Sequence, residues 1–181
     1  MEDPPRSSST TPVPADGMIR LNWSRNSIHN VVISSEDNEI MYEVSTPNGF
    51  SSTNRVTTVT KLDKYSGKRT VVGEIAYKLI RSQAEVRFGS EDGEWMLVDE
   101  WLKSSKAFST ARTFTAAGGA KYRWKLTSAE DPPEGRAPSL AIFHVNILTG
   151  PVPAYLDISP SVLASLNYIL IALLLYKVGS W

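Results

Sequence analysis

The chain has 181 residues, Lys+Arg equals Asp+Glu at 19 each, and Cys is absent. This length suits a single domain with its own core, and the balanced charge gives no overall field that would recruit nucleic acid or a membrane. The lack of Cys excludes a disulfide scaffold, a thiolate zinc site and a cysteine nucleophile, and it fits a reducing compartment.

Residues 1–17 predict a disordered tail. They are rich in Pro, Ser, Thr and acidic residues, and their only apolar members are Met1, Val13 and Ala15. Such a segment buries too little surface to offset the entropy lost on ordering. It also has the features of neither a secretory signal nor a transit peptide, so we expect a cytoplasmic protein, with the nucleus as an alternative.

From residue 18 onward the hydrophobic period is 2, which is typical of β-strands. In residues 39–46, for example, Ile40, Tyr42 and Val44 alternate with more polar neighbours, and Asp92-Gly93 marks a hairpin turn between two such runs. About a dozen strands therefore precede the end of the chain. The runs that carry this prediction are residues 18–23, 28–33, 39–46, 54–62, 70–80, 84–88, 94–98, 108–115, 121–127, 140–147 and 154–159.

Residues 160–177 predict one helix. Ser159 is a favourable N-cap, Pro160 a favourable first residue, and Lys177 and Gly179 suit the C-terminal end. Nine aliphatic side chains lie all round it and leave no polar face, so the helix must be surrounded by apolar matter. They are Val162, Leu163, Leu166, Ile169, Leu170, Ile171, Leu173, Leu174 and Leu175.

This surrounding matter is either protein or lipid. A tail anchor would use residues 162–176, but that run is shorter than the ~20 residues that usually span a bilayer, and Ser165 and Asn167 interrupt it. Inside a protein, Asn167 can find a polar partner on a strand, whereas in hydrocarbon it would have none. We therefore favour a buried helix and keep the tail anchor as the alternative.

Many sequential strands with no intervening helix favour a sandwich or a barrel. About eight strands are filled by their own side chains, so a barrel of about twelve has room for a further element. The apolar C-terminal helix would fill that room. We predict a mainly β domain over residues 18–181: a closed antiparallel barrel around a central helix.

Four segments resemble the tubby-like superfamily, and more narrowly a fungal family of uncharacterised domains within it. They are residues 40–46, residues 112–125 with their Tyr-x-Trp-Lys element, residues 141–143, and residues 156–160 leading into the helix. The resemblance covers residues 18–178 and implies a twelve-stranded barrel closed around a hydrophobic C-terminal helix. Relatives are described as phosphoinositide-binding, transcription-linked or lipid-moving. Scramblases in this superfamily carry cysteine-rich and calcium-binding segments that this sequence lacks, so the resemblance does not extend to lipid scrambling.

The sequence offers little for catalysis, metal binding or cofactor binding. His29 and His144 stand far apart in predicted strands, and no Gly-x-Ser-x-Gly elbow, P-loop or Gly-x-Gly-x-x-Gly occurs. The acidic run at residues 91–94 lacks the ligand spacing of a calcium loop. We therefore predict no catalytic, metal or cofactor residues, and a protein that is not an enzyme.

Charge is segregated along the chain. Residues 55–88 hold eight bases and three acids, residues 91–100 hold five acids and no base, and residues 101–125 hold six bases and no acid. Period 2 in residues 121–126 sends the cations to one face and Tyr122, Trp124 and Leu126 to the other. Two clusters are candidate sites for anionic lipid headgroups: the strand cations Lys121, Arg123 and Lys125, and the turn cations Lys64, Lys68 and Arg69.

Three functions follow as hypotheses. The first is a non-enzymatic domain that binds anionic lipid headgroups at cytosolic membrane surfaces. The second is a protein-interaction module whose partner is unknown and whose tail is regulated, and the third is the tail-anchored protein. Nucleic acid is an unfavourable ligand, because Tyr122 and Trp124 are expected to face inward.

Overall fold

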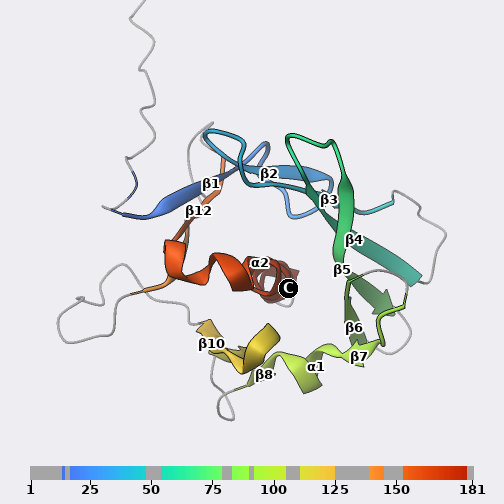
Figure 1. Ribbon diagram of the computed structural model, residues 1–181. Coiled ribbons are helices and arrows are strands. Elements are labelled where there is room, and N and C mark those ends of the chain that lie inside the picture. Colours follow the sequence, from blue (N-terminus) through green and yellow to red (C-terminus); the bar gives the residue numbers. More distant parts are fainter. Residues whose placement is uncertain are drawn as a thin grey trace, which may run out of the picture.

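The structure is a computed structural model that describes residue 14 and residues 17–47, 54–78, 83–89, 92–104, 111–124, 139–144 and 153–178. In this part of the chain it is mainly β, with two antiparallel sheets and a C-terminal helix (Figure 1). The predicted tail therefore lies almost wholly outside the described residues, as do the ends of several predicted strands.

The larger sheet has nine strands and the smaller has three. In spatial order the larger is β11 (Ala141–His144), β12 (Tyr155–Ile158), β1 (Ile19–Trp23), β2 (Val31–Ser35), β3 (Met41–Ser45), β4 (Asn54–Leu62), β5 (Arg69–Lys78), β6 (Gln83–Phe88) and β7 (Met96–Leu97). The smaller is β10 (Lys121–Trp124), β9 (Arg112–Thr115) and β8 (Lys103–Ser104). The helical elements are α1 (Val98–Trp101), η1 (Ala117–Gly119), η2 (Pro160–Ser165) and α2 (Leu166–Val178).

The first strand pairs with the last. β1 and β12 are antiparallel, with Leu21 opposite Leu156 and Arg20 opposite Asp157. Alternation then sends the two leucines, both fully buried, to the core face. The first and the last described strands in sequence are therefore neighbours in space.

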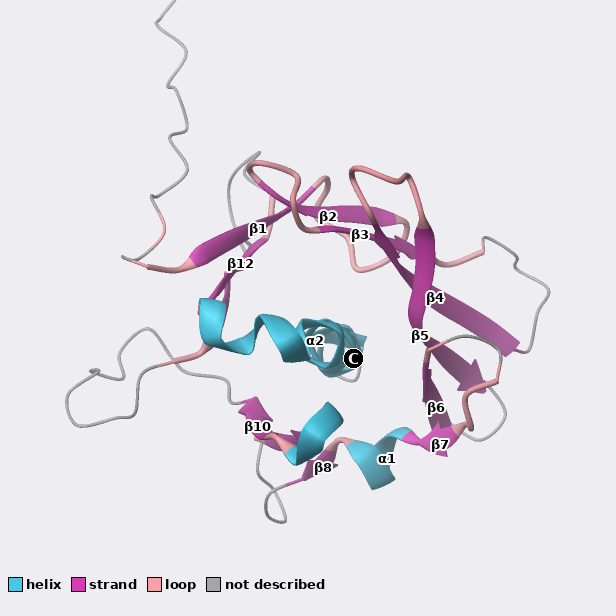
Figure 2. Cartoon of the chain, in the orientation of Figure 1, coloured by secondary structure: helices cyan, strands magenta, loops and turns pink. Residues whose placement is uncertain are grey.

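Both sheets lie around α2. Figure 1 shows α2 in the middle, with β1, β2 and β3 above it, β4, β5 and β6 to its right, and β7, α1, β8 and β10 below it, and Figure 2 shows α1 as the helical link between the two sheets. Among the described residues, no strand pair joins one sheet to the other. The described fold is thus a large and a small antiparallel sheet arranged about a C-terminal helix.

The predicted C-terminal helix is confirmed and is buried in protein. It begins at Pro160, where the Ser159 hydroxyl accepts a hydrogen bond from the Ser161 N–H (3.4 Å), and its first six residues form a 3-10 helix before α2. Eight of the nine aliphatic side chains are at most 6% exposed, and the exception, Leu163, is 39% exposed. Among the helices of the described chain, none combines the length and apolarity needed to cross a bilayer.

Ser165 and Asn167, the two polar residues that interrupt the apolar run, have tyrosine partners on opposite sides of the helix. The Tyr42 hydroxyl, on β3, donates to Asn167 Oδ1 (2.7 Å), and the Tyr122 hydroxyl, on β10, donates to Ser165 Oγ (2.9 Å). The expectation that Asn167 would find a strand partner is confirmed. Because each bond connects the helix to a different sheet, the polar groups fix the helix between the two sheets.

The helix approaches β5 at a glycine. A Cβ placed on Gly73 would collide with the Ile171 side chain and would lie 3.0 Å from the Arg87 carbonyl oxygen. Ile171 is fully buried. The lack of a side chain at residue 73 therefore sets how closely α2 packs on the larger sheet.

A row of aromatic rings crosses the boundary between the sheets at α1. Tyr168 of α2 stacks on Phe88 (centroids 4.6 Å apart), Phe88 meets Trp101 of α1 (4.8 Å), and Trp101 meets Phe114 of β9 (5.2 Å). Phe114 then stacks on Tyr122 (centroids 5.5 Å apart), and the Tyr122 hydroxyl is hydrogen-bonded to Ser165 of η2. Side-chain packing rather than strand pairing joins the described sheets here.

Three features of the strands differ from what the sequence predicted. The run at residues 94–98 is a strand only over Met96–Leu97, because α1 begins at Val98, and the two-residue strand β8 was not predicted. The β4–β5 register shifts between Val59 and Thr60, where β5 has the extra residue Val72, and both Val59 and Thr60 are buried. A bulge changes which side chains face the core, and period 2 alone does not reveal it.

Candidate functional site

The strand β10 carries the predicted stripe of cations as far as the structure describes it. Lys121 and Arg123 are exposed, while Tyr122 and Trp124 are partly buried against the core. The predicted alternation is therefore confirmed for these four residues. Lys125, the third predicted member, lies outside the described residues.

The register of the smaller sheet adds a cation that sequence reasoning missed. Thr113 of β9 lies opposite Lys103 of β8 on one side and opposite Arg123 of β10 on the other, so all three share the outer face. Strand geometry then places the α-carbons of Lys103 and Arg123 about 10 Å apart, and those of Lys121 and Arg123 about 7 Å apart. We name Lys103, Lys121 and Arg123 the cationic face.

No carboxylate neutralises the cationic face within the described chain. β8, β9, β10 and the turn between β9 and β10 hold no Asp or Glu, and the nearest acids in sequence, Asp99 and Glu100, make no ion pair with these three cations. Like charges on one sheet face repel each other. Binding of an anion would relieve that repulsion, so the arrangement suits an anionic ligand.

The second predicted cluster, at the turn between β4 and β5, is different. Lys64 Nζ lies 3.2 Å from Glu39 Oε1 and also donates to the Asp37 carbonyl oxygen (2.8 Å), and Arg69 pairs with Glu43. Hydrogen bonds from Tyr65 and then Lys64 lower the pKa of Glu39, so this partner stays anionic. Two of the three turn cations therefore already have carboxylate partners.

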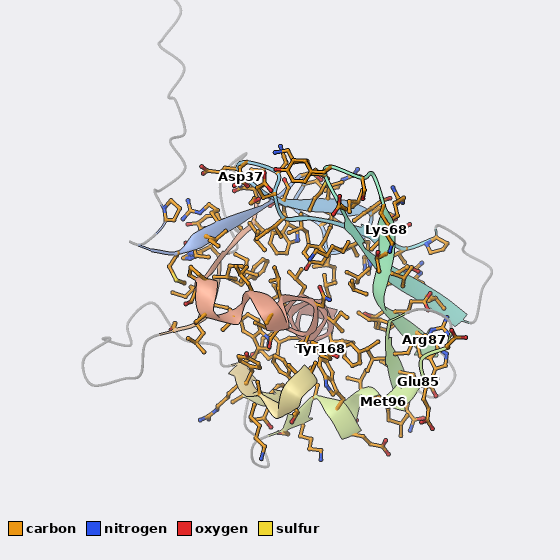
Figure 3. The ribbon with its side chains drawn as sticks, in the orientation of Figure 1. Asp37, Lys68, Glu85, Arg87, Met96 and Tyr168 are labelled. Atoms are coloured by element: carbon orange, nitrogen blue, oxygen red, sulfur yellow. The ribbon has the colours of Figure 1, made fainter. Side chains whose placement is uncertain are left out.

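The two clusters do not form one site. Figure 3 labels Lys68 on the side of α2 opposite to β8 and β10, and Asp37 lies on that same side as Lys68. The structure thus separates the turn cations from the cationic face. Of the turn cluster, only Lys68 makes no ion pair with a described residue.

The two histidines contact structural groups in separate places. His29 Nδ1 lies 3.2 Å from Thr46 Oγ1, and burial, followed by the charge of Arg55, lowers the His29 pKa. His144 stacks on Tyr155 (4.3 Å), and burial lowers its pKa although Asp157 acts in the opposite sense. None of these contacts pairs an imidazole with a serine nucleophile, and the described residues contain no group of three metal-ligating side chains.

A buried ion pair in the larger sheet was also missed by sequence reasoning. Arg20 Nε and one terminal nitrogen donate to the two oxygens of Asp157 (2.7 and 2.8 Å), and the guanidinium lies 3.9 Å from the centroid of the Tyr155 ring. The hydrogen bond from Arg20 to Asp157 is the main reason that the Arg20 pKa is raised. The partners are 137 residues apart, so only the β1–β12 register could have revealed the pair.

Comparison with known proteins gives a family. The model of a family described as "Family of unknown function (DUF6593)" matches residues 26–178, which is more than half of the chain. Neither the curated proteins nor the solved structures give a match.

Proposed function

We propose that this chain, which belongs to the family of unknown function DUF6593, binds the anionic headgroups of phospholipids at the cytosolic surface of membranes. The observation that supports this most is the cationic face, where Lys103, Lys121 and Arg123 are exposed and share one sheet face that holds no described carboxylate. The protein acts in this proposal as a non-enzymatic binding domain.

The size of the interaction is sufficient for reversible binding. Each Lys or Arg near an anionic membrane surface contributes about 1 kcal/mol, so three such residues contribute about 3 kcal/mol. Salt screens this attraction, because the Debye length at physiological ionic strength is about 8 Å. We therefore expect binding that is clear at low salt and weakens as salt is added.

The same proposal includes the finer fold assignment. We interpret the two sheets and α2 as a closed, tubby-like barrel around a central helix, in keeping with the sequence resemblance. Support comes from the position of α2 between the sheets and from the aromatic row that joins them through α1. The cytoplasm is the proposed location, since the ligand would be an anionic lipid of a cytosolic leaflet.

Co-sedimentation with phosphatidylcholine vesicles, with and without phosphatidylserine or phosphoinositides, tests the proposal. We expect the full chain to sediment only with the anionic vesicles, and Lys121→Ala/Arg123→Ala to lose most of this binding. The matched control is Lys64→Ala/Arg69→Ala, which changes net charge equally but removes cations that already pair with Glu39 and Glu43. If the two double variants bind equally well, the cationic face is not the binding site.

A further inference from the structure

Large exposed hydrophobic side chains are not spread evenly over the described surface. There are five of them, and three lie around β11 and η2: Leu140 (42% exposed), Ile142 (40%) and Leu163 (39%). The other two, Val32 and Tyr65, belong to the β1–β5 part of the larger sheet. We name Leu140, Ile142 and Leu163 the apolar rim.

Backbone contacts connect the members of the apolar rim. The Leu140 carbonyl oxygen accepts a hydrogen bond from the Ser159 N–H (2.8 Å), and Ser159 is the N-cap of η2, the helix that carries Leu163. Leu140 directly precedes β11 and Ile142 is its second residue, and both side chains are exposed. The rim therefore follows the boundary where the edge strand β11 meets η2.

The helix η2, which carries Leu163, lies against β10, the strand whose outer face holds Lys121 and Arg123. Ser165, two residues after Leu163, bonds to the Tyr122 hydroxyl of β10 (2.9 Å), and Tyr122 stands between Lys121 and Arg123 in sequence. Figure 1 shows the orange-red coil of η2 between β12 and β10. Exposed apolar side chains and exposed cations are thus carried by neighbouring elements, Leu163 by η2 and Lys121 and Arg123 by β10.

The geometry points to a bilayer-docking surface in which the apolar rim enters the lipid interface while the cationic face holds anionic headgroups. This inference rests on the proposed function and deepens it by assigning the orientation of the protein on the membrane. A bilayer with anionic lipids is the favoured occupant because its surface offers both chemistries at once, negative headgroups and, just beneath them, apolar chains. A single weak signal gives only marginal membrane attachment, and two adjacent signals reinforce each other.

The chain contains no Cys, so one introduced thiol can be labelled at a chosen position. We would label Leu163→Cys with an environment-sensitive nitrobenzoxadiazole probe and add phosphatidylcholine vesicles with or without phosphatidylserine. The expected result is a brighter, blue-shifted emission with anionic vesicles only. Val32→Cys is the matched control, because Val32 is also 39% exposed but lies on β2, and its emission should not change.

The outcomes separate this inference from the proposed function. Protein that sediments with anionic vesicles without a blue shift at residue 163 overturns insertion and leaves headgroup binding in place. Protein that does not sediment overturns both. A blue shift at residue 163 that grows with protein concentration in the absence of vesicles assigns the rim to a second copy of the chain and overturns the bilayer.

A substitution series gives a second measurement that needs no label. Leu163→Ser and Ile142→Ser should each weaken vesicle binding severalfold, and the loss should persist at a salt concentration that suppresses the cationic contribution. Val32→Ser should leave binding unchanged. Equal binding by all three variants and the original chain would overturn the role of the rim.

Discussion

Acidic and basic residues are distributed differently in the two sheets. In the larger sheet cations and acids are interleaved, and they pair with each other in the sheet or its turns: Arg20 with Asp157, Lys64 with Glu39, Arg69 with Glu43, and Arg87 of β6 with Glu74 of β5. In the described part of the smaller sheet there are cations and no acids. Charge in the first region therefore contributes to the fold, whereas Lys103, Lys121 and Arg123 in the second make no ion pair with a described residue.

The sheets also hold α2 by different means. The larger sheet brings its backbone close to the helix at Gly73 and donates one buried hydrogen bond from Tyr42. The smaller sheet contacts the helix through aromatic rings and through the less buried Tyr122. We infer that the larger sheet supplies most of the stability, and three comparisons of variants test this from the largest expected effect to the smallest.

The largest effect is expected for Asp157→Asn. The side chains of Arg20 and Asp157 are 3% and 7% exposed, so the substitution leaves a buried guanidinium without its counter-charge. Removing one partner of a buried pair typically costs about 3–5 kcal/mol. Urea denaturation followed by tryptophan fluorescence measures the loss.

Glu43→Gln is the control for this variant, because it removes the same charge from an exposed pair. Arg69 and Glu43 side chains are 57% and 35% exposed, and exposed pairs contribute at most about 1 kcal/mol. A loss for Glu43→Gln as large as that for Asp157→Asn would contradict the distinction between buried and surface pairs in the larger sheet.

A smaller loss is expected for Gly73→Ala. The added methyl group collides with the Ile171 side chain, and overpacking of a close-packed core costs about 1–3 kcal/mol. Ile171→Val shortens the side chain that collides, so Gly73→Ala/Ile171→Val should recover part of the loss. Thermal unfolding of the single and double variants forms the cycle. Strictly additive losses would show that the two residues do not determine the distance between β5 and α2.

The smallest expected effect is the difference in stability loss between Tyr42→Phe and Tyr122→Phe. Tyr42 is 1% exposed and burial raises its pKa, so its hydroxyl stays protonated and donates to Asn167. Tyr42→Phe leaves the Asn167 amide without this partner in the core and should cost about 1–3 kcal/mol. Tyr122→Phe removes a bond at a partly buried site and should cost about 0.5–1.5 kcal/mol.

Chemical denaturation of both variants at neutral pH gives this comparison. Equal losses would mean that the two sheets hold the helix equally firmly. A larger loss for Tyr122→Phe would reverse the assignment of stability to the larger sheet.

Local sequence patterns predicted the features that depend on local chemistry. Alternation located most strands, the all-apolar run identified a buried helix, and the cost of an unpaired amide predicted that Asn167 would have a partner. The alternation of Lys121 to Trp124 also predicted which of these side chains reach solvent. Each of these follows from a period or from one residue's need for burial or a partner.

The remaining features depend on which strands meet, and the sequence pattern does not contain that information. Arg20 and Asp157 become a pair only through the β1–β12 register, and Lys103 joins the cationic face only because the two-residue strand β8 pairs with β9. The register shift between Val59 and Thr60 likewise places both residues in the core; β4 has no Gly or Pro there, and the glycine at the shift, Gly73, lies on the partner strand β5.

The position of α2 in chain order has a consequence for biosynthesis. The ribosome synthesises every described strand before this helix leaves the exit tunnel. The strands therefore emerge before the helix on which their core side chains pack. β1 must also wait for β12, its final neighbour, until nearly the whole described chain has been translated. We therefore expect this domain to complete its folding only after α2 has left the exit tunnel, with chaperones covering the exposed inner faces of the strands during the delay.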